Sequence, residues 1–348
     1  MKSTRTNLRY ATLLVALTAS LSMNAQLVQD NEQALVYYMP KTELVFDIHY
    51  DETIRTAGIY AQYADLLGIH DPITKTDTTY IIRDVQVSTR ATADTDRAYK
   101  VVAANELNTQ LIALSREGIL AGYNISVADS SPETASAQHG KSAVVTEFST
   151  PLVIPFMESD MKVDDDEARA EKVAEQIFQI RETRMFILAG EVDHYPTDGK
   201  AMEEVLATLE QQEHFLVSLF SGTVQVNHLT KSFTYCPTHS EEVVLANFNN
   251  ETGFGEGESL MLTIAATKQV KSASTEPVNK KAPQPSQIYY NLPGTARYSL
   301  IFSDKLLAEG EDKMAQLGVA IPLTKDLFKE NIHIIFDTET GNIVSIYR

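Results

Sequence analysis

Three charged residues interrupt apolar stripes that are otherwise typical of the buried faces of two helices. At about 100° per residue, Arg181 and Arg184 project within about 40° of Ile177, and Glu213 lies similarly close to Leu209. A charge on a core-facing stripe must be paired or hydrogen-bonded, because burying it alone is costly. These residue types predict either an ion-pair network that fixes how the helices dock, or a cleft in which the arginines bind the carboxylate or phosphate of a small anionic ligand. A face that is simply exposed to solvent is the third explanation.

The acidic partner of these arginines is open at this point. In an antiparallel hairpin with a rise of ~1.5 Å per residue, Glu213 lies further from the turn than Arg181. Glu191, Asp193 or a residue on a strand could therefore be the partner instead. The candidate ligand-binding set is Arg181, Arg184, Glu191, Asp193 and Glu213, and a structural ion pair is the favoured interpretation of the same residues.

These residues lie within the segment 164–222, which predicts an antiparallel helical hairpin. Acids open the first helix at Asp164–Glu167, where they cap free N–H groups and complement the helix dipole. Capping is favoured over cation binding, because the run lacks the glycine and the alternate ligand spacing of a calcium loop. The apolar stripe of the first helix runs through residues 170–188 and is expected to stop at Gly190, and Gly222 is expected to end the second helix.

Strand-like sequence flanks the hairpin on both sides. Runs with strand character occupy residues 34–51, 79–88, 98–104, 223–236, 242–248 and 260–267. A β-hairpin is predicted to turn at Glu117-Gly118. We therefore predict an α+β fold in which two β-rich units, residues 26–163 and 223–348, are separated by the central helical pair.

The two β-rich units carry similar short segments in the same order. Tyr37–Pro40 is echoed by Tyr289–Pro293, and Leu67–Ile73 is echoed by Leu317–Leu323. The hairpin at Gly118 is echoed by strand-like sequence close to the C-terminus. A degenerate internal duplication explains these echoes, and chance is the alternative, because Pro, Gly and Tyr favour turns and strand ends in any protein.

The N-terminal 25 residues have the features of a secretory signal peptide. Lys2, Arg5 and Arg9 precede an apolar run over residues 11–21, and cleavage is predicted after Ala25. We therefore expect export to the periplasm or the cell surface.

Charge and cysteine content limit the partners of the mature chain. Removal of residues 1–25 takes away three positive charges and no acid, so the formal net charge changes from −18 to −21. Such an acidic protein is not expected to bind nucleic acid by neutralising phosphates. No later apolar run is long enough to span a bilayer. The single cysteine, Cys236, lies far from the predicted cleavage site, so we expect neither a lipid anchor nor an internal disulfide.

Recognisable signatures of metal or catalytic sites are missing from the sequence. Cys236 and His239, with His228 nearby, are zinc-type ligands, but no second pair follows at the spacing of a zinc site. The glycine loop at residues 254–257 precedes a strand rather than a helix, so it is a poor phosphate cradle. No nucleophile elbow and no His-Glu-x-x-His helix is present. We expect no metal and no cofactor.

Four segments resemble a known family. They are the Tyr-Tyr-Met-Pro-Lys-Thr segment at residues 37–42, the Ile-Arg-Glu-Thr-Arg run at residues 180–184 followed by Gly190-Glu191, and the segments Tyr290–Gly294 and Ala315–Val319. Together they are similar to domain-of-unknown-function family 4831, a group of exported proteins of Gram-negative gut and oral anaerobes. The resemblance covers nearly all of the mature chain, and it implies export and a single fold without any assigned activity.

These observations favour a non-enzymatic exported envelope protein that binds a partner protein or a ligand. The alternative is a periplasmic hydrolase that uses an acid–base pair of Asp and Glu residues, because such carboxylates can converge only in the fold.

Overall fold

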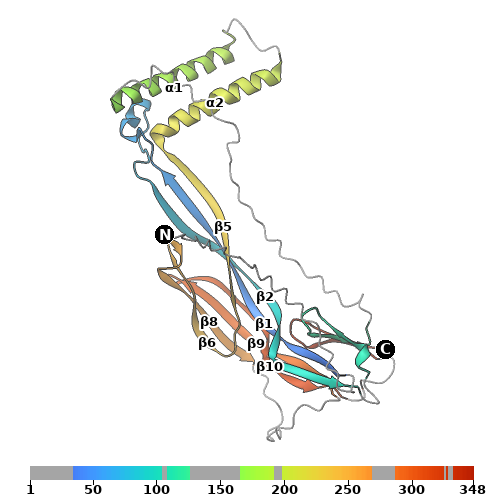
Figure 1. The fold of residues 1–348 in the computed structure, drawn as a ribbon. Coiled ribbons are helices and arrows are strands. Elements are labelled where there is room, and N and C mark those ends of the chain that lie inside the picture. The colour runs from blue at the N-terminus through green and yellow to red at the C-terminus, as the bar shows by residue number, and fades with distance from the viewer. Residues whose placement is uncertain are drawn as a thin grey trace, which may run out of the picture.

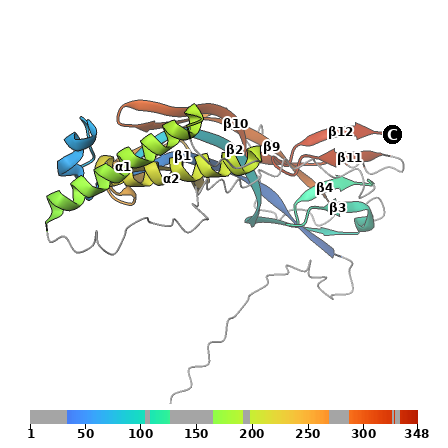
Figure 2. The same cartoon turned by 90° about the horizontal axis from the view of Figure 1, so that it is seen from above.

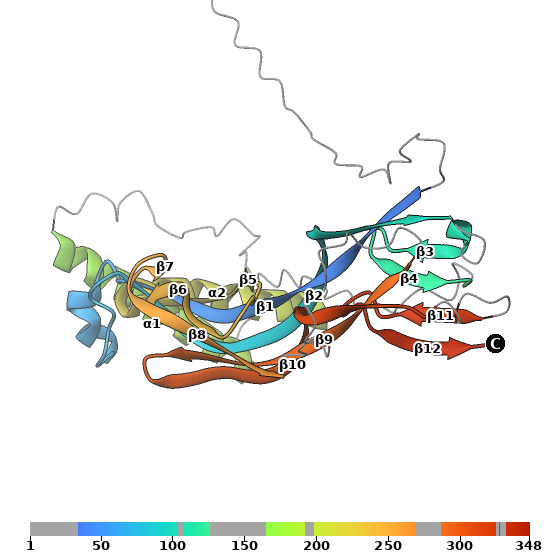
Figure 3. The same ribbon diagram turned by 90° about the horizontal axis from the view of Figure 1, so that it is seen from below.

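The computed structural model describes residues 34–103, 108–125, 165–191, 198–268, 287–324, 327 and 332–348. The predicted signal peptide and the predicted site residue Asp193 lie outside these ranges. The molecule is elongated, with a pair of helices at one end and a small sheet near the C-terminus at the other (Figure 1). Views from above and below show the same separation of the two ends (Figures 2 and 3).

A long antiparallel ribbon runs through most of this length. It consists of β1 (Ala34–Thr56) and β2 (Asp77–Val102), which pair from Ala34 opposite Val102 to Arg55 opposite Asp77. β5 (Thr223–Tyr235) pairs with the second half of β1, so the sheet has the strand order β2-β1-β5.

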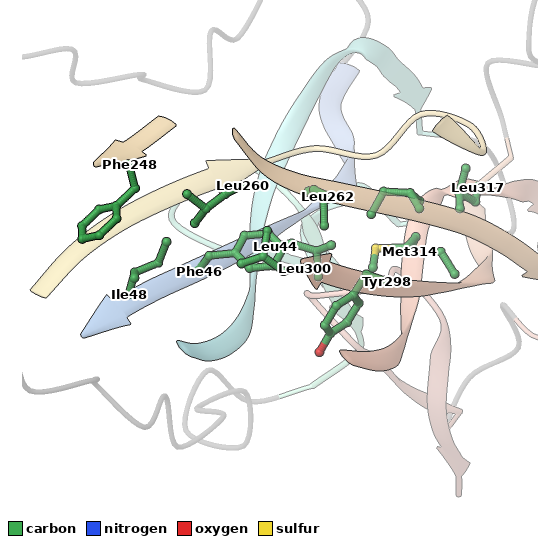
Figure 4. Packing of buried hydrophobic residues seen from close by; sticks show 12 residues of the cluster. Leu44, Phe46, Ile48, Phe248, Leu260, Leu262, Tyr298, Leu300, Met314 and Leu317 are labelled. Atoms are coloured by element: carbon green, nitrogen blue, oxygen red, sulfur yellow. The ribbon is translucent and has the colours of Figure 1, made fainter. Parts of the chain in front are cut away.

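A second sheet packs against this ribbon to form the central core. Its strand order is β10-β9-β8-β6-β7, with β6 (Glu241–Asn249), β7 (Gly253–Phe254), β8 (Glu258–Lys268), β9 (Tyr289–Phe302) and β10 (Lys305–Pro322). Leu44, Phe46 and Ile48 are fully buried because alternate side chains of β1 point to the same face. They pack against side chains of β8 and β9 that include Leu262 and Leu300 (Figure 4).

A third sheet joins the front and the rear of the chain. Its order is β12-β11-β4-β3, with β3 (Ile112–Leu114), β4 (Leu120–Tyr123), β11 (His333–Phe336) and β12 (Ile343–Tyr347). The short 3-10 helix η2 (Thr109–Leu111) precedes β3. Its core includes Tyr37 and Met39 from the start of β1. The predicted hairpin is confirmed, because β3 pairs with β4 and Gly118 between them has a positive φ of 80°.

The two central helices are α1 (Asp166–Ala189) and α2 (Gly199–Ser221), and the predicted helical pair is confirmed. The side chain of Asp165 caps α1 by accepting a hydrogen bond from the Glu167 N–H, and Gly190 ends α1 in the left-handed conformation. The helical core contains Ala170, Val173, Ala174, Ile177, Leu216 and Phe220. The N-terminal half of α1 therefore packs against the C-terminal half of α2, together with the 3-10 helix η1 (Ala61–Leu67).

The base of the helical pair is fixed to the connection between β1 and β2. The Tyr60 N–H donates to the Leu219 carbonyl at 2.8 Å, and the Ile73 N–H donates to the Ser221 carbonyl at 2.9 Å. Gly222 ends α2 with a φ of 75°, and a Cβ at this position would lie 2.5 Å from the Thr56 carbonyl oxygen. Only glycine fits this junction without a shift of the backbone.

The structure is an α+β fold rich in strands, as predicted. Strands from residues 26–163 and 223–348 share sheets, since β5 pairs with β1 and β11 pairs with β4. The internal duplication stays a prediction.

Candidate functional site

The two arginines singled out from the sequence converge on one carboxylate. The Nε of Arg181 donates to Oε1 of Glu213 at 2.6 Å, and Nη1 of Arg184 lies 2.9 Å from Oε2 of the same residue. The Glu213 side chain is 14% exposed, whereas those of Arg181 and Arg184 are 40% and 35% exposed. The guanidinium of Arg181 also lies 5.9 Å from the centroid of the Phe178 ring.

This cluster extends the contact between the two helices by one polar layer beyond Ile177. Each oxygen of Glu213 contacts one of the two arginines. Two guanidinium groups against one carboxylate leave a formal charge of +1 and N–H groups in partial contact with solvent. The arrangement can hold the helices together, and its excess positive charge suits a small anion.

The structure brings together three of the five predicted site residues. Glu191 follows the end of α1 and is exposed. Its backbone N–H donates to the Phe186 carbonyl, which closes the helix end. Asp193 lies outside the described residues. Anion binding by this set stays a prediction.

A second polar cluster lies on the β2-β1-β5 sheet, and sequence reasoning missed it. Asp51 of β1 has a side chain that is only 5% exposed. Its Oδ2 accepts from Nε of Arg83 on β2 at 2.6 Å, and its Oδ1 lies 2.7 Å from Nδ1 of His228 on β5. The spacing of these residues along the chain gave no signal, because the strand pairing that joins them spans 177 residues.

Asp51 is held in its charged form. Burial raises the pKa of this carboxyl, but the hydrogen bonds from His228 and Arg83, together with their charges, outweigh it and leave the pKa below its usual value. An ionised Asp51 accepts the Nδ1–H of His228, whose side chain is 69% exposed. A carboxylate that orients an imidazole in this way is one part of a general-base site.

Segments that carry the family resemblance meet in a buried polar junction. Asn291 is fully buried, and its Nδ2 donates to the carbonyls of Ala315 and Thr340, both at 2.8 Å. Gln316 accepts the Thr42 N–H at its Oε1 and donates from Nε2 to the Thr42 carbonyl, both at 2.9 Å. Thr42, Asn291 and Gln316 therefore tie β1, β9 and β10 together, which is a structural role.

Close backbone contacts reinforce the same junction. A Cβ at Gly294 would lie 2.5 Å from the Leu317 carbonyl oxygen, and one at Gly318 would lie 2.2 Å from that of Leu292. These glycines allow β9 and the irregular stretch of β10 to approach more closely than any side chain permits.

The outward face of α1 is unusual because it mixes apolar and acidic side chains. Phe178 is 51% exposed, Met185 69% and Phe186 43%. Exposed acids share this face, which we call the apolar–acidic face and define as Glu171, Glu175, Phe178, Glu182, Met185 and Phe186.

The prediction that the buried stripe of α1 reaches Leu188 is wrong. Leu188 was placed on that stripe, but its side chain is 70% exposed. The described buried residues of α1 end at Ile177, because the hydrophobic contact with α2 and η1 involves the first half of the helix.

The residues considered as metal ligands have other partners. Cys236 lies 3.5 Å from Nε2 of Gln316, and burial raises the pKa of its thiol. His239 contacts Glu241 at 3.6 Å, and His228 contacts Asp51. Within the described ranges, no three His, Cys, Asp or Glu side chains are grouped so that they could hold a metal ion. In the same ranges, no helix has the length and apolarity that a bilayer crossing requires.

The architecture defines a class of strand-rich α+β protein in which a long ribbon ends in a helical pair. The chain belongs to the family described as Domain of unknown function (DUF4831), whose model matches residues 33–344. No curated protein and no solved structure matches the chain.

Proposed function

We propose that the protein is an exported, non-enzymatic binding protein of the cell envelope that contacts a partner through the apolar–acidic face of α1. The observation that carries this proposal is the exposure of Phe178, Met185 and Phe186 on one helix at the end of an elongated molecule. Burying one such side chain stabilises a contact by roughly 1.5–3 kcal/mol. A cluster of exposed large apolar side chains is therefore a mark of an interaction site.

Export is supported by the N-terminal sequence. Positive charge, an apolar run and a small residue at the cleavage position are the three parts of a secretory signal. Fractionation of the producing cells tests this part of the proposal, with the mature chain expected outside the cytoplasm. A full-length, uncleaved chain in the cytoplasm would refute it.

The binding role is tested by comparing variants in the producing cells. Tagged protein would be purified after cross-linking from the parent, from the F178S/M185S/F186S variant, and from a V344S/I346S control on β12. All five of these side chains are exposed, so both variants are expected to fold. We expect proteins that co-purify with the parent and the control but not with the α1 variant. Identical co-purification from all three would exclude α1 as the binding element.

The Asp51–His228 pair favours a second candidate, a hydrolase that uses His228 as its general base. A neutral imidazole that is oriented by a buried carboxylate and has an exposed side chain can accept a proton from water at its other nitrogen. Hydrolysis of p-nitrophenyl esters by the parent and by H228N tests this candidate. Equal rates in the two proteins would remove it.

A further inference from the structure

Resting on the proposed partner-binding function, we infer that the apolar–acidic face of α1 binds a basic amphipathic helix of a partner protein. The partner helix presents an apolar stripe interleaved with Lys or Arg. The inference depends on the spacing of the exposed residues, on their charge and on the charges that are absent from the same face.

The spacing is that of a coiled-coil seam. Glu171, Glu175, Phe178, Glu182 and Met185 follow one another at intervals of four, three, four and three residues. This alternation keeps side chains on one line along a helix, where they interdigitate with a second helix of the same repeat. All five residues are exposed in the structure, so the described part of this chain does not supply that second helix.

The width of the face also suits a single helix. At about 100° per residue, these five residues and Phe186 fall within an arc of about 100° around α1. A face of that width is what one helix presents to one neighbour. From Glu171 to Phe186 the face is about 22 Å long at ~1.5 Å per residue, so a partner helix of about four turns would cover it.

The charge on this face selects the partner. Three of the six residues are acids, and the basic residues of α1 lie outside the arc. Arg181 and Arg184 are paired with Glu213 on the side that faces α2, and the Arg181 guanidinium also lies 5.9 Å from the centroid of the Phe178 ring at the edge of the face. Lys or Arg side chains opposite Glu171, Glu175 and Glu182 would complement these acids, while apolar side chains cover Phe178 and Met185.

The same charge disfavours two other occupants. A second copy of α1 packed on this face would place acids opposite acids, which destabilises a contact. An anionic membrane surface attracts basic helices and repels this acidic one. A basic helix is the occupant that satisfies both the apolar and the charged positions.

Binding of designed peptides to the mature protein tests the inference. The probe is a fluorescent helical peptide with Leu and Lys at the seam positions. One control peptide has Glu in place of each Lys, and another has the same composition in scrambled order. We expect anisotropy to report binding of the Leu/Lys peptide and at least tenfold weaker binding of both controls, a difference of about 1.4 kcal/mol. Binding should weaken as salt is raised, because the charges lie at a solvent-exposed face.

Matched variants of the protein separate the two parts of the face. F178S/M185S should abolish peptide binding. E171Q/E175Q/E182Q should weaken it about tenfold or more. The control E203Q/E204Q/E210Q removes three exposed acids from α2 and should leave peptide binding unchanged. Circular dichroism checks that every variant keeps its helices.

Three outcomes would overturn the inference. They are equal binding of the Leu/Lys and Leu/Glu peptides, equal weakening by the α1 and α2 charge variants, and binding of phosphatidylcholine vesicles instead of the peptide. The proposed function fails separately, through co-purification that does not depend on Phe178, Met185 and Phe186. If co-purification depends on these side chains but the Leu/Lys peptide does not bind, the docking element is retained and the partner class is wrong.

Discussion

Removing the two arginines that hold Glu213, singly and together, tests how the helical pair is stabilised. Each arginine supplies one charge-assisted contact to Glu213, at 2.6 Å from Arg181 and 2.9 Å from Arg184. In Arg184→Ala the carboxylate keeps Arg181 as its partner, so no buried charge is left alone. We expect this variant, and likewise Arg181→Ala, to lose about 1 kcal/mol of unfolding free energy.

The double variant should be disproportionately destabilised. With both arginines gone, Glu213, whose side chain is 14% exposed, has neither of its cationic partners. Leaving a fully buried charge unpaired costs about 3–5 kcal/mol, and the partial exposure of this cluster brings the expected cost to about 3 kcal/mol. The excess over the sum of the single variants is therefore about 1 kcal/mol.

Urea unfolding followed by helical circular dichroism measures all three variants. Arg297→Ala is a matched control, because Arg297 contacts Glu311 at 3.3 Å on an exposed surface and should cost less than about 0.5 kcal/mol. Costs that add without coupling would refute the shared role of Glu213. A loss of 3–5 kcal/mol in Arg184→Ala alone would show that Arg181 does not compensate.

Three other perturbations have defined outcomes. Tyr37→Phe should lower the free energy of unfolding by about 1–3 kcal/mol, measured by thermal or urea unfolding. The reason is that the buried hydroxyl both donates to the Tyr289 carbonyl and accepts the Tyr289 N–H. An unchanged stability would show that water replaces the lost hydroxyl. Because the pKa of Asp51 is lowered, its ionised carboxylate stabilises the fold at neutral pH. This stabilisation is lost as the pH falls below the usual carboxyl pKa of about 3.9 and then through the lowered pKa of Asp51. Asp51→Asn should therefore be less stable at neutral pH, with a shallower decline of melting temperature below about pH 4, and an unchanged acid profile would contradict the ion pair with Arg83. Gly222→Ala should lower the free energy of unfolding by about 2 kcal/mol or more, because the positive φ and the 2.5 Å approach to the Thr56 carbonyl oxygen both oppose a Cβ. An unchanged free energy of unfolding would show that the junction can shift.

Local features of the sequence predicted the helical pair and its polar contact. The apolar period of α1, the acids at its start and Gly190 at its end are all set by nearby residues, so no knowledge of the fold is needed. Arg181 and Arg184 were expected to be partly buried and paired with an acid, and Glu213 is that acid. The turn at Gly118 was predicted for the same local reason.

Features that depend on strand pairing were not predictable in this way. Neither Asp51 nor Arg83 stands in a pattern that shows its partner, because the partner strand is chosen by the global fold rather than by neighbouring residues. The sharing of sheets between the front and rear of the chain has the same origin. Leu188 was assigned to the buried face because its angular position is correct, but helical periodicity does not show how far along α1 the packing extends.

The position of β1 has a consequence for how the chain folds. This first described strand supplies Tyr37 to one core and Phe46 to another, and its last residue, Thr56, lies against Gly222 at the end of α2. Its contacts reach partners 177 residues away at His228 and 252 residues away at Tyr289. Contacts of such high sequence separation slow folding, because the entropy of closing long loops is lost before the contacts form. Nearly the whole chain must therefore be synthesised before β1 can make all of its contacts. A truncation after α2 would leave the sheet of β1 without β5, and it would leave the central core without the opposing sheet.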